Sequence, residues 1–133
     1  MKVIIRLLLL LSLVVIIAGC TVNNSSDTIL SVGKATNPHD AQFKNTNDSK
    51  KIKIINDVFK EKKWSANKEF DVREKIPDLI LEISKSNEGF SALIVTVYFN
   101  ENGADVINFK GEHTVLNKDE ADRVKEAASI SLA

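Results

Sequence analysis

The chain has 133 residues, and its 18 basic residues balance its 18 acidic residues. A balanced charge excludes the strongly basic class of nucleic-acid-binding proteins and argues against a polybasic patch that holds a protein on membrane lipids. The sequence contains one cysteine, so an internal disulfide cannot stabilise the fold and that cysteine requires another explanation.

The first 19 residues have the features of a secretory signal peptide. Lys2 and Arg6 give a basic start, and residues 7–18 follow as an apolar stretch whose only polar member is Ser12. This stretch is shorter than the roughly 20 apolar residues that a transmembrane helix needs. We therefore expect residues 1–19 to be removed, which takes away both of these basic residues and leaves a mature chain with a net charge of about −2.

The signal ends in a motif that resembles the lipobox of bacterial lipoproteins. A branched residue, Ile17, precedes the small residues Ala18 and Gly19, and Cys20 follows them. This pattern predicts transfer of a diacylglycerol group to the Cys20 thiol, cleavage between Gly19 and Cys20, and acylation of the new amino terminus. Two alternatives stay open, namely an ordinary secretory signal with a chance cysteine and an uncleaved anchor.

A lipid on Cys20 would attach the protein to the cell membrane at its extracytoplasmic face. One acyl chain gives marginal membrane binding, whereas two chains give stable anchoring. Residues 21–27 are rich in Asn and Ser and contain no large apolar cluster, which is typical of a flexible tether. We therefore expect a lipidated amino terminus and tether over residues 20–35 and one small domain over residues 36–133.

The first half of the predicted domain contains a short edge strand and a helix. Ala41–Phe43 is the candidate strand. Asn47 or Asp48 is a suitable helix cap, and the helix is expected to end near Trp64 and Ser65. Apolar residues then recur at steps of three and four, which predicts one buried stripe, formed by Ile52, Ile55, Val58 and Phe59.

The second half of the predicted domain has the apolar patterns of β-strands. Pro77 fits the start of a strand in which Leu79, Leu81 and Ile83 share a face. Residues 90–99 are apolar on both faces, which is typical of a central strand. Residues 100–103 read Asn-Glu-Asn-Gly, a strong turn signal, and two further strands are expected at residues 104–109 and 113–116.

A second helix is predicted at the carboxyl end. Asn117 and Glu120 have the spacing of a capping box, and Leu116 and Ala121 stand where a hydrophobic staple would pack. The element order predicts an α+β fold, a small two-layer sandwich. In it, an antiparallel sheet of three to five strands carries an N-terminal and a C-terminal helix on one face.

The sequence contains no recognisable catalytic or metal-binding motif, and we expect no cofactor, no metal and no enzymatic activity. Three residues are candidates for a binding site. Trp64 is either an exposed aromatic anchor or a seal between the helix end and the sheet. Tyr98 either marks a ligand-facing side of the sheet or packs against a neighbouring strand. His113 either joins a site with unidentified partners or is an edge-strand histidine.

Several of these features together resemble the YhfM-like domain of small Bacillus-type lipoproteins, over roughly residues 40–130. The resemblance is carried by the helix stripe from Ile52 to Phe59, by Trp64, by Pro77 and Asp78 opening a strand, by Tyr98, and by residues 116–120 opening a helix. It implies a Gram-positive surface lipoprotein with a compact α+β domain, and it supplies no catalytic residues.

The sequence favours a membrane-anchored, non-catalytic binding or interaction module of the cell envelope. Its partners would be the membrane, through the lipid on Cys20, and an envelope protein or ligand that the sequence does not identify. We expect a monomer that does not bind nucleic acid. The alternative is a divergent cell-surface enzyme with an unrecognised site. A two-lobed transport protein is disfavoured, because about 114 residues offer one small domain.

Overall fold

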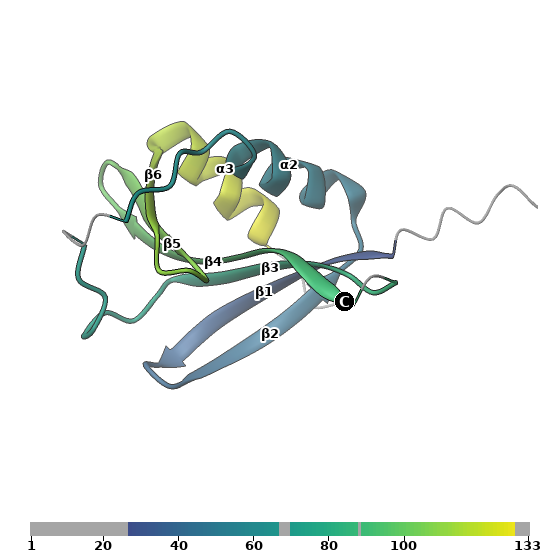
Figure 1. Ribbon diagram of the computed structural model, residues 1–133, viewed down its shortest axis with the longest axis horizontal. Helices are drawn as coiled ribbons and strands as arrows, with labels where there is room; N and C mark the ends of the chain where they lie inside the picture. The colour runs from purple at the N-terminus through teal and green to yellow at the C-terminus, as the bar shows by residue number, and fades with distance from the viewer. Residues whose placement is uncertain (1–26, 67–69, 88, 130–133) are drawn as a thin grey trace, which may run out of the picture.

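In the part of the chain that the structure describes, one antiparallel sheet combines with two helices (Figure 1). The computed structural model describes residues 27–66, 70–87 and 89–129. In chain order the elements are β1 (Thr28–Asn37), β2 (Asp40–Thr46), α2 (Ser49–Phe59), β3 (Leu79–Lys85), β4 (Phe90–Asn100), β5 (Gly103–Asn108), β6 (His113–Asn117) and α3 (Lys118–Ala128).

The helices form one layer and the sheet forms the other (Figure 1). The six strands lie in the order β2-β1-β3-β4-β5-β6, and each neighbouring pair is antiparallel. The α+β class and the antiparallel sheet are therefore confirmed, but the predicted count of three to five strands was too low. As expected, the apolar strand β4 lies in the interior of the sheet, and β2, which contains the predicted strand Ala41–Phe43, lies at an edge.

The sheet has more strands than predicted because β1 was missed. Residues 28–35, which the sequence predicts to lie in the tether, belong to a strand that is paired on both sides, with β2 and with β3. Leu30 and Val32 are buried in this strand, opposite Ile83 and Leu81 of β3. The folded domain therefore begins near Thr28 rather than at residue 36. The remainder of the expected tether, residues 20–26, lies outside the described residues.

The two helices begin where the sequence predicted. The Asp48 side chain accepts a hydrogen bond from the backbone N–H of Lys50 at the start of α2. Asn117 and Glu120 form the complete capping box at the start of α3. Helix α2 ends at Phe59, five residues before the expected end at Trp64. No helix of the described ranges is long and apolar enough to cross a membrane.

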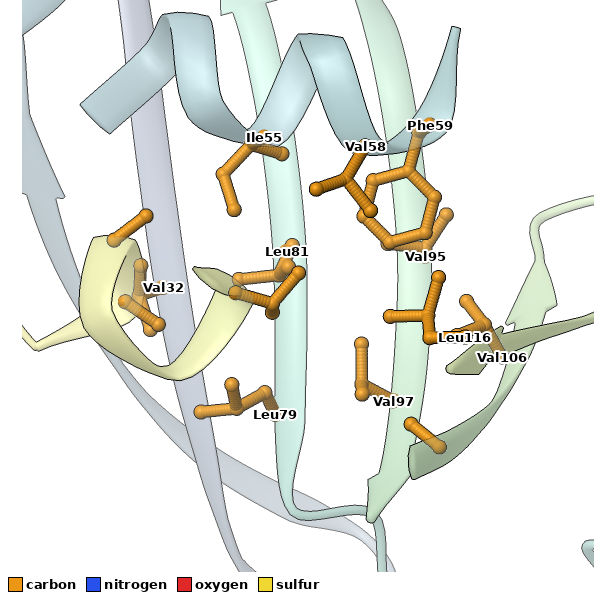
Figure 2. Close-up of a cluster of buried hydrophobic side chains, with 14 of the residues drawn as sticks. Val32, Ile55, Val58, Phe59, Leu79, Leu81, Val95, Val97, Val106 and Leu116 are labelled. Atoms are coloured by element: carbon orange, nitrogen blue, oxygen red, sulfur yellow. The ribbon is translucent and has the colours of Figure 1, made fainter. Parts of the chain in front are cut away.

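A single apolar core lies between the helices and the sheet. Figure 2 shows Ile55, Val58 and Phe59 of α2 directed toward Leu81 of β3 and Val95 of β4. Because neighbours along a strand point to opposite faces, these strands present every second side chain to the core. The fully buried residues include Leu30, Ile55, Leu81, Val95, Val97, Val106, Leu116 and Val124. The predicted shared face of Leu79, Leu81 and Ile83 is confirmed, although β3 begins at Leu79 rather than at Pro77.

Candidate functional site

The second face of the sheet is covered by neither helix, and we call it the open face (Figure 1). Side chains that alternate with the core residues lie on this face, and strand register places them in rows. One row runs across all six strands, from Phe43 in β2 to His113 in β6. Its members, in order across the sheet, are Phe43, Gly33, Ile80, Thr96, Ile107 and His113.

At one edge of the open face, Phe43 lies over the backbone of Gly33. A Cβ atom on Gly33 would stand 2.6 Å from a ring carbon of Phe43, so the aromatic ring occupies the space of the missing side chain. Phe43 is nevertheless 51% exposed. The ring therefore packs against Gly33 of β1 and leaves part of its apolar surface toward solvent.

At the opposite side of the open face, a carboxylate and an imidazole form a pair. Nε2 of His113 in β6 lies 2.8 Å from Oδ1 of Asp105 in β5. The second oxygen of this carboxylate, Oδ2, accepts a hydrogen bond from Nδ2 of Asn100 at 2.9 Å. About four-fifths of each of the paired side chains is removed from solvent. The pair thus joins β5 to β6, and Asn100 at the end of β4 holds its carboxylate.

Phe70 packs against this pair from outside the sheet. Its ring is stacked on the ring of His113, with centroids 5.5 Å apart, and meets the ring of Tyr98 edge-on at 5.2 Å. Both geometries are favoured by the charge distribution of aromatic rings. Burial raises the pKa of the Tyr98 phenol above its ordinary value. Phe70, Tyr98, His113 and Asp105 therefore form one cluster on the open face, which we call the aromatic cluster.

The segment between α2 and β3 reaches this cluster by passing the outer edge of β6. Ser65 and His113 exchange two backbone hydrogen bonds, of 2.9 and 2.8 Å. Nζ of Lys62 donates to the carbonyl oxygen of Val115 at 3.1 Å and to Oε1 of Glu120 at 2.7 Å. These contacts bind the segment to β6 and α3. Phe70, later in the same segment, packs on the open face of the sheet.

The same segment rejoins the sheet beside Tyr98. The backbone N–H of Asp78 donates to the carbonyl oxygen of Val97, and Oδ2 of Asp78 accepts from the backbone N–H of Phe99 at 2.7 Å. Between the segment and the end of β4 there is a cavity of about 270 Å³. Its walls include the aromatic residues Phe70, Tyr98 and Phe99, the carboxylates of Asp78 and Asp105, and Lys75.

Two of the three predicted site residues meet in this arrangement. Tyr98 and His113 both contact Phe70. Trp64 does not join them, because its ring stacks on Phe59 at 6.3 Å and packs partly buried against the core. For Trp64 the packing alternative is therefore correct. Ile17, Ala18, Gly19 and Cys20 lie outside the described residues, and the described residues contain no group of side chains that could hold a metal ion.

Two members of the cluster, Asp105 and Phe70, are not among the residues predicted from the sequence. Asp105 could have been identified from the sequence, because a turn joining Asn100 to Gly103 places residue 105 opposite Tyr98, as observed. Phe70 gave no comparable signal, since it belongs to an irregular segment with no periodicity.

The chain matches no family model, no curated protein and no solved structure.

The contact between Lys62 and Glu120 predicts a specific pH dependence of stability. Burial raises the pKa of Glu120, but the hydrogen bonds from Lys62 and from the backbone of Asn117 outweigh this effect, and the pKa of Glu120 lies below its ordinary value. A carboxyl group whose pKa is lower in the folded state stabilises the fold above its unfolded pKa. This stabilisation is lost as the pH falls through the folded pKa.

We therefore expect Glu120→Gln to lose less stability than the parent between about pH 6 and about pH 3. Urea unfolding of the mature chain at both pH values measures this difference. The matched control is Glu126→Gln, at an exposed position of the same helix, which should follow the parent. Equal losses in the parent and in Glu120→Gln would contradict the role given to this ion pair.

Proposed function

We propose that the chain is a membrane-anchored bacterial lipoprotein whose folded domain is a non-catalytic binding or interaction module on the extracytoplasmic face of the cell membrane. The lipobox from Ile17 to Cys20 supports the anchor. Since β1 begins at Thr28, residues 20–27 would link the lipid to the domain. Eight extended residues span at most about 25–30 Å, so the domain would stay close to the bilayer.

The observation that carries the binding role is the aromatic cluster beside the cavity on the open face. Binding sites are concave, apolar and aromatic in lining, with a few polar groups that orient the ligand. Here Phe70 and Tyr98 supply the aromatic surface, while Asp78 and Asp105 supply polar atoms. The site stands on β4 and β5, two strands whose other face packs into the core, so the ligand would meet a preformed surface.

The contacts of His113 support binding rather than catalysis. One ring nitrogen is engaged by Asp105, and one ring face is covered by Phe70. These contacts hold the imidazole between the sheet and the segment that carries Phe70, which is a structural use of the residue. We propose that the partner is an envelope protein or ligand and that the domain works as a monomer. The resemblance to Bacillus-type lipoproteins supports a Gram-positive host and remains a proposal.

A cell-surface enzyme is the second candidate, and the Asp105–His113 pair is the observation that favours it. A carboxylate that orients an imidazole is a common element of general acid–base catalysis. The two functions differ in what happens to the bound molecule. A ligand recovered unchanged supports the binding module, whereas conversion that stops in His113→Asn would support the enzyme.

The lipid anchor is tested by Cys20→Ser. Because Cys20 is the only cysteine and the proposed acceptor of the diacylglycerol, this variant should incorporate no radioactive palmitate and should leave the membrane fraction. Ser26→Ala is the control and should remain labelled and membrane-bound, since it lies beyond the lipobox. Continued labelling of Cys20→Ser would refute the proposed anchor.

The binding surface is tested by cross-linking in cells. A photoreactive phenylalanine analogue replaces Tyr98 on the open face or, as the control, Asp122, an exposed residue of α3. The proposed site should give a discrete cross-linked product from position 98 and little from position 122. Products from position 122 alone would place the interaction surface on the helices and contradict the proposal.

A further inference from the structure

The chain places one of its own ammonium groups on an aromatic wall of the cavity. Nζ of Lys75 lies 4.2 Å from the ring centroid of Phe70, and this ring lines the cavity. An ammonium group within about 6 Å of an aromatic face is attracted by the negative charge on that face. The Phe70 wall of the cavity therefore already attracts a cation.

Two carboxylates that line the cavity also favour a cation there. Asp78 and Asp105 both line the cavity, together with the aromatic rings. Both oxygens of Asp105 have partners, in His113 and Asn100. Asp78 accepts from the backbone of Phe99 through Oδ2, and among the described residues its Oδ1 makes no hydrogen bond. Oδ1 of Asp78 is thus an acceptor available to a donor that enters the cavity.

We propose that the cavity binds a primary alkylammonium group, of the kind that ends a lysine-like side chain, and that Lys75 is an internal occupant which the ligand displaces. This inference rests on the proposed binding role and names the chemical class of the ligand. The ammonium group of the ligand replaces that of Lys75 on Phe70 and donates a hydrogen bond to Asp78. The cavity volume of about 270 Å³ is near the lower limit for ligand pockets and has room for one such side-chain end.

The probe is pentylammonium, and it is compared with two molecules of the same chain length, pentanol and pentanoate. The protein is the mature chain with Cys20→Ser, which retains every described strand and helix. Amide chemical shifts are followed by NMR during titration. Pentylammonium should shift the amides of Tyr98 and Asp105 in a saturable manner. Neutral pentanol and anionic pentanoate should cause smaller shifts that do not saturate.

Three variants separate the proposed contacts. Lys75→Met removes the internal occupant and should tighten pentylammonium binding about twofold to fivefold, the range expected for one exposed cation–aromatic contact. Phe70→Leu should weaken binding by a similar factor. Asp78→Asn should also weaken it, while its amide oxygen keeps the acceptor for the Phe99 N–H. Asp78→Asn therefore tests the charge even if Phe70→Leu disturbs the segment.

Lys110→Met is the matched control, because Nζ of Lys110 lies 5.8 Å from the ring of Phe109, and neither residue lines the cavity. Its affinity for pentylammonium should equal that of the parent. Weaker binding of pentylammonium by Lys75→Met than by the parent would overturn the proposal. Stronger binding of pentanoate than of pentylammonium would also overturn it and would indicate an anionic ligand held by Lys75. Absence of binding by all three probes would also overturn it. Cross-linking from position 98 would still report a binding module, so the two failures are distinguishable.

Discussion

Two backbone hydrogen bonds between Ser65 and His113 fix the path of the chain from the helix layer to the open face. They lie at the outer edge of β6, where an unpaired strand would otherwise present its backbone groups to solvent. Lys62 adds a third contact to the same edge through the carbonyl of Val115. The segment that follows α2 therefore covers this edge (Figure 1). Phe70, later in the same segment, contacts Tyr98 and His113.

This path separates the face of the sheet that is packed in the core from the open face, where we propose that a partner binds. The helices bury one face of the sheet in a continuous apolar core, and that face holds the strands rigid (Figure 2). The open face needs no such packing and can keep aromatic and charged side chains accessible. Tyr98 and Asp105 belong to strands that are fixed from behind by Val97 and Val106. A rigid base under a cluster of polar and aromatic groups reduces the entropy lost on binding.

Local patterns predicted much of this fold, while contacts between distant residues escaped prediction. Each predicted feature can be recognised within a short stretch of sequence. This holds for the alternation in β3 and β4, for the helix stripe and for the capping box at Asn117. Strand β1 was not predicted. Gly33 lies at its centre, and the reason for a glycine there is the ring of Phe43, which lies on the next strand and not within β1. The position of Phe70 was equally hidden, since it depends on the bridge from Ser65 to a strand 48 residues later in the chain.

The segment after α2 places Phe70 against His113 and Tyr98 on the open face, and the proposed binding site depends on this placement. NMR of the mature chain, selectively labelled at its aromatic rings, measures this directly. With ring centroids 5.5 and 5.2 Å away, Phe70 should give nuclear Overhauser effects to His113 and to Tyr98. Absence of both effects, with Phe70 ring shifts typical of an exposed residue, would contradict the account.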